Sequence, residues 1–415
     1  VVLVAPGSYS GAGNVDLDFH GVDLVCRSEA GARSTILQVG PPVGHRAFHL
    51  TNGESRAAVI GGFTIVGGAA DDGGAIACRN ASPTIRDCLI DQCRAGRGGG
   101  LFFEASSAWV ERVTVTRCRA SYDGDLDQNG GALYLLDSNV DLEDCTFSGN
   151  LASGFPYTPA ALFLRGGGTL RRCVVSGNEG IGISADRVLL DHCVAAFNDR
   201  QEIDVVTTAE IEGSIIRDTC DASDVHLQPG ATATIACTML IPDKVEGSGT
   251  VQYLDPPIPL NPNFCDIPNC PSIPSVDGNF AVGPDSPARP ENNPCGQFLG
   301  AIEASSCDPA AVGGQGGSWP EPDLAIELRG ARPNPCSREL AIDFRLREAG
   351  RVRIRLLSPS GRSVATLDDQ SRAKGEQTWI GQLPGISGSA AAGVYLLELS
   401  TAGRTATTPI VVLPR

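Results

Sequence analysis

The chain has very little lysine, no surplus of positive charge and no long apolar run. Its 415 residues include 32 Lys and Arg against 48 Asp and Glu, which gives a formal net charge of −16. Phosphate binding requires clustered basic residues, so this balance argues against nucleic acid as a partner. No apolar segment reaches the roughly 18 residues that a membrane-spanning helix needs. We therefore expect a soluble body with no transmembrane segment.

A CxxC pair is also missing, although the chain has 15 cysteines. So many cysteines without a metal or redox motif favour an oxidising compartment, and we predict a secreted protein. There is no initiator methionine and no signal peptide, and we interpret the chain as processed or incompletely represented. It opens on a strand-like segment made of Val1, Val2, Leu3, Val4 and Ala5.

Helix-period patterns are almost absent, whereas a short phrase recurs along the chain. Gly-Gly followed by alternating apolar residues begins at Gly73, Gly99 and Gly130, with degenerate copies at Ala160, Gly180 and Glu202. Ten or so residues after each phrase stands a small or apolar slot, occupied by Cys88, Val113, Cys145, Cys173, Cys193 and Ser214. Five residues further on stands a third column, with Cys93, Cys118, Asn150, Asn178, Asn198 and Thr219.

A repeat of 20 to 30 residues with two or three short strands cannot bury its inward face alone, but stacked coils can. Stacking at the roughly 4.8 Å strand spacing places like residues over like residues. We therefore predict a parallel β-helix over residues 1–255, in an all-β protein. Asn150, Asn178 and Asn198 suit the coil corners as a ladder, because Asn tolerates left-handed geometry and bonds neighbouring backbone. Cys88, Cys145, Cys173 and Cys193 are expected to be buried small hydrophobes rather than disulfides.

These phrases resemble the right-handed, single-stranded parallel β-helix repeats of the pectin-lyase-like superfamily. Phe147-Ser148-Gly149-Asn150 is similar to the second repeat phrase of chlamydial-type polymorphic outer-membrane proteins. The resemblance implies a fold and a bacterial extracellular or outer-surface location, and it implies little about activity, since one scaffold hosts many functions. In that family an amphipathic helix usually covers the open first coil, so we expect either that such a cap lies outside this sequence or that something else covers the exposed strand edge.

Beyond the repeats, residues 256–312 are rich in Pro and Cys and resemble the segment that closes many such bacterial β-helices. On short sequence separation alone, the preferred disulfides are Cys265 with Cys270 and Cys295 with Cys307, and Cys220 with Cys237 is a third candidate. Residues 313–322 have the Gly and Pro content of a linker.

From residue 323 to 415, alternating strands recur at intervals of 10 to 20 residues and predict an Ig-like β-sandwich. Pro333-Asn334-Pro335, Gly361-Arg362 and Gly393-Val394-Tyr395 resemble the C-terminal sorting domains of type IX secretion substrates and the Ig-like domain of the flagellar hook-capping protein. The resemblance implies export by the type IX route. Cys336 and the Leu-Pro-Arg terminus depart from that pattern.

Residues that could carry chemistry are sparse. Asp71-Asp72 and Gly44-His45-Arg46 are only fragments of polygalacturonase-like motifs, and we interpret them as coincidence. No catalytic residue is predicted, so the sequence leans against an enzyme. The stretch Asp123-Gly-Asp125-Leu-Asp127-Gln-Asn129-Gly matches the first half of a calcium loop but lacks the closing Glu. It is either a Ca²⁺ site, with Asp123, Asp125, Asp127 and Asn129 as ligands, or a solvated acidic loop; no other cofactor is predicted.

Charge is divided unevenly between the two ends of the chain. Residues 323–415 contain 13 basic and 9 acidic side chains, which makes this part +4 and the remainder −20. Three functions remain open: a non-catalytic surface protein with a structural or adhesive role and a possible glycan ligand, the subunit of a head-to-tail extracellular filament, and a polysaccharide lyase or glycoside hydrolase. In the filament hypothesis the basic domain of one copy docks on Val1–Ala5 of the next.

Overall fold

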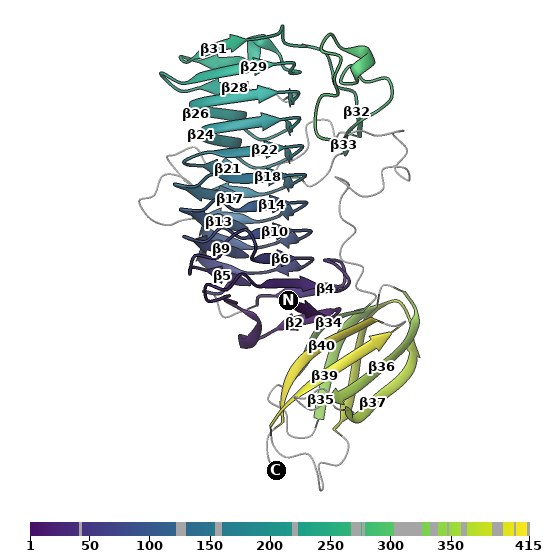
Figure 1. Cartoon of the computed structure of the whole chain (residues 1–415). Helices are drawn as coiled ribbons and strands as arrows, with labels where there is room; N and C mark the ends of the chain where they lie inside the picture. Colours follow the sequence, from purple (N-terminus) through teal and green to yellow (C-terminus); the bar gives the residue numbers. More distant parts are fainter. Residues whose placement is uncertain are drawn as a thin grey trace.

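The structure is a computed structural model of the whole chain (Figure 1). It describes residues 1–40, 44–121, 130–153, 160–217, 223–266, 275, 279–302, 326–332, 339–346, 348–357, 363–383, 393–401 and 404–412. Within these residues the only helices are three short 3-10 turns at Ala12–Asn14, Pro242–Lys244 and Pro290–Asn292. None of the described helices is long and apolar enough to cross a membrane.

Parallel strands stack along one axis and form the faces of a prism. Face 1 contains β5 (Phe48–Leu50), β9 (Ile76–Arg79), β13 (Leu101–Glu104), β17 (Gly130–Leu136), β21 (Ala160–Leu164), β28 (Ser223–Leu227) and β30 (Val245–Gly247). Face 2 contains β1 (Val2–Val4), β3 (Val25–Ser28), β6 (Val59–Gly61), β10 (Thr84–Arg86), β14 (Trp109–Glu111), β18 (Val140–Glu143), β22 (Gly168–Arg171), β29 (Thr232–Ala236) and β31 (Thr250–Tyr253). The longer strands β24 (Ile181–Asp191) and β26 (Gln201–Glu212) run through both faces and join them into one sheet.

Face 3 is a second parallel sheet. It contains β2 (Gly7–Ser10), β4 (Thr35–Gln38), β7 (Thr64–Val66), β11 (Leu89–Asp91), β15 (Thr114–Thr116), β19 (Thr146–Ser148), β23 (Val174–Ser176), β25 (Val194–Ala196) and β27 (Ile215–Arg217). A short fourth strip contains β8 (Ala69–Asp72), β12 (Arg94–Arg97), β16 (Arg119–Ser121) and β20 (Leu151–Ser153). The stack is a parallel β-helix, as the repeat predicts, and it is right-handed, as the resemblance implies.

Inward side chains of the faces fill one continuous core along the axis. Leu101, Leu133 and Leu162 are fully buried at equivalent positions of successive coils, as the register Leu101↔Leu133↔Leu162 requires. Because strand side chains alternate, a repeat with apolar residues at every second position presents one such row per strand. The recurring phrase therefore produces both the strand and its place in the core.

The segment after the last coil folds back along face 3. It contains the antiparallel pair β32 (Phe264–Asp266) and β33 (Asn279–Val282). Phe264, Phe280 and Leu299 pack there with Val194 and Ile215, on the outer side of face 3. Face 3 is thus buried on both sides at this end of the stack.

The C-terminal domain, here the described part of residues 326–412, is built of two antiparallel sheets. One contains β34 (Ile326–Arg332), β35 (Glu339–Leu346) and β38 (Gly375–Gln382), and the other contains β37 (Ser363–Arg372), β36 (Gly350–Leu357), β39 (Gly393–Thr401) and β40 (Arg404–Val412). Side chains of β35, β36 and β39 share one core that is separate from that of the β-helix. Its Ig-like classification and the link to type IX secretion remain predictions.

The C-terminal domain lies at the first-coil end of the β-helix (Figure 1), where β40 runs beside β2 of the same chain. The last coil, with β30 and β31, lies at the opposite end. The linker predicted at 313–322 falls outside the described residues.

Candidate functional site

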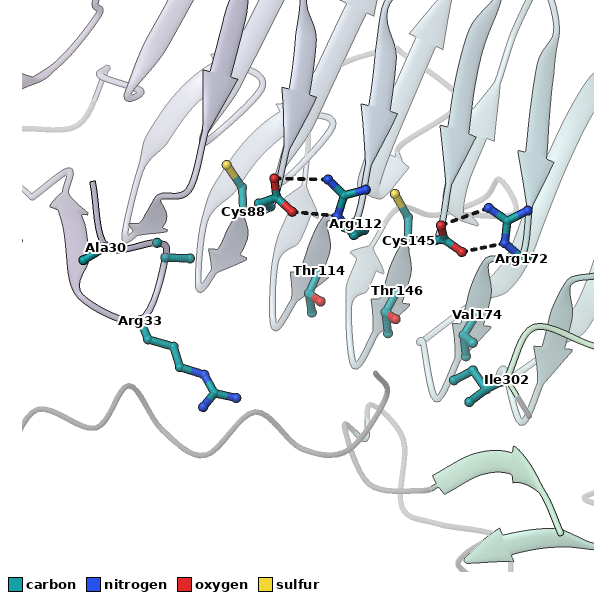
Figure 2. A pocket seen from close by; sticks show the side chains of 14 residues that line it. Ala30, Arg33, Cys88, Arg112, Thr114, Cys145, Thr146, Arg172, Val174 and Ile302 are labelled. Carbon is teal, nitrogen blue, oxygen red and sulfur yellow. Dashed lines mark hydrogen bonds and ion pairs between the residues drawn. The ribbon is translucent and has the colours of Figure 1, made fainter. Parts of the chain in front are cut away.

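A groove of about 320 Å³ runs along one corner of the β-helix (Figure 2). Its floor comprises the corner between faces 2 and 3 and the outward side chains of Thr114, Thr146 and Val174. Residues 30–33 border one end and Ile302 the other. The groove thus continues the strip of face 3 on which the closing segment packs.

The corner is formed by one left-handed residue in each coil. Asp87, Arg112, Asp144 and Arg172 have φ values of 55°, 50°, 53° and 49° and directly precede the column Cys88, Val113, Cys145 and Cys173. A single residue in this conformation turns the chain sharply from face 2 to face 3. Stacking of the coils then places these four side chains in one row along the groove.

These corner side chains alternate in charge and bind in pairs. Nε and Nη2 of Arg112 donate to Asp87 at 2.7 and 3.2 Å, and those of Arg172 donate to Asp144 at 2.7 and 3.0 Å. The hydrogen bonds that Arg172 donates to Asp144 and then to Glu143 raise the pKa of its guanidinium above its ordinary value. The floor of the groove is therefore a set of satisfied ion pairs that join adjacent coils.

Cysteine thiols lie directly beneath this corner. Cys88, Cys145, Cys173 and Cys193 are buried, stacked in one column and free of disulfides. Burial raises the pKa of Cys88 to about 12. Burial, together with hydrogen bonds to Cys145 and Cys193, also raises the pKa of Cys173 well above its ordinary value. A thiol held in the neutral form is a packing group rather than a nucleophile.

The asparagine column forms a continuous ladder at the next corner. Nδ2 of Asn150 donates to Oδ1 of Asn178 at 3.0 Å, and Nδ2 of Asn178 donates to Oδ1 of Asn198 at 2.9 Å. Each Oδ1 also accepts a hydrogen bond from the backbone N–H of the preceding residue in the column. The backbone N–H of Cys118 donates to Asn150 Oδ1 at 3.0 Å, and that of Asn178 donates to Asn198 Oδ1 at 3.1 Å. The ladder ends on Glu202, a fully buried carboxylate that accepts from both the backbone N–H and Nδ2 of Asn198. The column spacing in the sequence does not predict this place for Glu202.

A second charged cluster is centred on Asp72. Nε and Nη2 of Arg97 donate to its carboxylate at 2.7 and 3.0 Å, and Arg79 bridges Asp72 and Glu104. The guanidinium carbons of Arg79 and Arg97 lie 4.8 and 5.1 Å from the centre of the Phe102 ring. From the sequence alone, Asp71-Asp72 is interpreted as coincidence. Aligning the coils in register predicts the cluster, because Arg97 then lies opposite Asp72 and Glu104 lies opposite Arg79 on adjacent strands.

A third polar group lies on the outward side of face 1. Oδ1 of Asp204 accepts from Gln228 Nε2 at 2.9 Å and lies 2.8 Å from Nδ1 of His226, while Ser184 Oγ donates to Oδ2 at 3.4 Å. The Asp204 side chain is 7% exposed and that of His226 is 29% exposed. The three hydrogen-bonding partners tie Asp204 into coils on both sides of it. Sequence reasoning missed this group because its members stand on separate coils.

Two of the predicted disulfide pairings are wrong. Cys237 pairs with Cys295, with a Cα–Cα distance of 5.8 Å, so Cys237 does not pair with Cys220 and Cys295 does not pair with Cys307. The fold brings Cys237, which follows β29, against the closing segment across a sequence separation of 58 residues. Short separation was therefore a poor guide. Cys265 is also disulfide-bonded, and the predicted partner Cys270 lies outside the described residues.

The predicted calcium ligands Asp123, Asp125, Asp127 and Asn129 also fall outside the described residues. In the described part of the chain, no group of three or more His, Cys, Asp or Glu side chains could hold a metal ion. The assembly candidates Val1 to Ala5 contain β1, and Val1, Val2 and Leu3 are 81%, 44% and 50% exposed. The docking predicted between copies at this end remains untested, and the C-terminal domain lies beside β2 of its own chain.

Comparison with known proteins identifies the fold. The family model described as "Right handed beta helix region" matches residues 42–186 and 74–238. No curated protein matches the chain. Among solved structures, it is similar to the enzymatically active domain of tailspike protein 4 of bacteriophage CBA120, with a TM-score of 0.34, 11% identity and 95% of this chain covered. The match spans 65% of that tailspike chain. The family match and the parallel stack together establish a right-handed parallel β-helix.

Proposed function

We propose that this protein is a secreted, non-catalytic β-helix with a structural or adhesive role outside the cell. The observation that carries the proposal is the use of polar side chains to brace one coil against the next. The Asn150–Asn178–Asn198 ladder, the corner ion pairs and the Asp72 cluster each join two or more coils. Such ladders stiffen a stack in which each coil contacts only its neighbours.

The same pairing limits what these groups offer to a substrate. Arg97 and Arg172 each place two guanidinium nitrogens on one carboxylate, and Asp204 has three side-chain partners. A general acid or base must instead reach a substrate proton directly or through one water. The described polar clusters therefore fit a structural role better than proton transfer.

The disulfide between Cys237 and Cys295 supports the extracellular part of the proposal. It links the last coils to the closing segment, and structural disulfides persist chiefly in oxidising compartments. Surface labelling of intact producing cells, followed by digestion with added protease, tests this part. We expect the protein to be labelled and digested while a cytoplasmic marker stays intact; protection of the protein together with that marker would contradict it.

Turnover assays test the non-catalytic part. The purified protein is incubated with acidic and neutral glycans, and released reducing ends and unsaturated-product absorbance are measured. We expect no turnover. Cleavage of a glycan that is lost in Asp204→Asn but kept in the exposed-site control Glu210→Gln would overturn the proposal and identify face 1 as an active site.

A further inference from the structure

Exposed large apolar side chains are confined to particular parts of the molecule. Among the described residues they are Val1, Val2, Leu3, Val22, Tyr253, Leu254, Leu260, Val364 and Ile380. They therefore lie on the first coil, on and just after the last coil, and on the C-terminal domain. The described shaft, from β3 to β29 (residues 25–236), exposes none. Exposed apolar residues that gather in one place mark interaction surfaces more often than scattered ones do.

The last coil presents an open strand edge. In the described structure β30 pairs only with β28 and β31 only with β29, so the outer edges of both strands are unpaired. Tyr253 ends β31 and Leu254 follows it directly, and these two side chains are 38% and 59% exposed. An unpaired strand edge with apolar neighbours is a template for further pairing.

This end also carries negative charge. Asp243, Glu246 and Asp255 are exposed around the last coil. The C-terminal domain has the opposite net charge, since residues 323–415 sum to +4. Opposite charges on two surfaces steer their association and favour one orientation.

The C-terminal domain also has an open edge of its own. β38 is the outer strand of its sheet and pairs only with β35 among the described strands. Exposed and half-buried residues alternate along β38, and Ile380 is 74% exposed between the exposed residues Thr378 and Gln382. An apolar residue so exposed on an edge strand is unusual for a surface that faces only water.

These two surfaces lie at opposite ends of the molecule (Figure 1), because the C-terminal domain sits at the first-coil end. They are placed to meet between copies rather than within one chain. A contact between two different surfaces of identical copies is heterologous, and it builds an open chain unless rotation closes a ring.

We propose that the last coil of one copy receives the β38 edge of the C-terminal domain of the next copy. The partner is a second copy of this chain, and the product is a head-to-tail assembly. Tyr253 and Leu254 contact the exposed Ile380, and the opposite net charges of the last coil and of the C-terminal domain favour their association. This inference rests on the structural role proposed above and supplies its partner.

Mixing two single-site variants of the full chain tests the contact. Leu254→Asp blocks the last coil, Ile380→Asp blocks β38, and Thr208→Asp adds the same charge at an exposed site on the shaft as the control. Assembly is followed by sedimentation velocity from nanomolar to millimolar protein at low salt. We expect the unchanged chain and Thr208→Asp to form growing oligomers that dissociate as salt screens the charges. Each blocked variant alone stays monomeric, and their equimolar mixture stops at dimers.

A chain that stays monomeric over the whole range would overturn the inference, as would normal assembly by either blocked variant or a mixture that fails to dimerise. None of these outcomes alters the glycan turnover assay. Failure of the assembly contact is therefore distinguishable from failure of the proposed non-catalytic role.

Discussion

The shaft of the β-helix and its last coil are built from equivalent strands, but their side chains have different surroundings. On the shaft, polar groups are paired between coils and large apolar groups are buried, so each coil is satisfied by its neighbours. The last coil has a neighbour on one side only, and it exposes both a strand edge and apolar side chains. A stacked fold thus confines its unsatisfied surface to its ends.

Among changes that test this comparison, the largest loss of stability is expected in the asparagine ladder. Asn178→Ala removes the donor to Phe147 O and Asn198 Oδ1 and the acceptor of two Asn150 hydrogen bonds, all of them buried. Because several buried groups lose partners, we expect the free energy of unfolding to fall by about 3 to 5 kcal/mol. Urea denaturation measures this change. The exposed-site control Asn139→Ala should cost under about 0.5 kcal/mol, and equal losses would show that the ladder does not brace the shaft.

The next largest loss of stability is expected at the end of the stack, where a disulfide links the last coils to the closing segment. Replacing Cys237 and Cys295 together by Ser should lower stability by about 3 kcal/mol, because the crosslink closes a long loop in the unfolded chain. Thermal unfolding with and without reductant measures it. Reductant should weaken the unchanged chain more than the double variant. Identical responses would mean that the closing segment stays in place without the bond.

A pH dependence is expected from the buried thiols of the shaft. Burial raises the pKa of Cys88 from 9.0 to about 12, so the folded chain keeps a proton that the unfolded chain loses. The contribution of the Cys88 thiol to the free energy of unfolding is fully present below pH 9. It is lost as the pH rises toward 12, by about 1.4 kcal/mol per pH unit. Urea midpoints from pH 8 to 11 should therefore fall less steeply in Cys88→Ala. Parallel curves for the two proteins would contradict a buried neutral thiol.

The smallest effect is expected at the corner ion pairs. Arg172→Ala should destabilise the protein by under about 1 kcal/mol, because the pair with Asp144 is partly exposed and solvent screens it. The loss should shrink in high salt, whereas that of Asn178→Ala should not. Urea denaturation of both variants at two salt concentrations compares them. A salt-independent loss at Arg172 would mean that its packing, rather than its charge, braces the corner.

How far the sequence predicts this molecule depends on whether a feature repeats. The parallel β-helix follows from the phrases at Gly73, Gly99 and Gly130, because equivalent residues of stacked coils have the same surroundings and therefore the same residue types. The pairing of Cys237 with Cys295 could not be predicted, because it depends on how the closing segment folds back along face 3. The Asp204 and Asp72 groups were missed for a related reason, since their members join only once the coil register is known.

Electron microscopy of the unmodified protein at low salt tests the contrast between shaft and ends most directly. We predict rods that join end to end, with the C-terminal domain of one against the last coil of the next, and with no contact between shafts. Rods that associate side by side, or that remain single at every concentration, would contradict it.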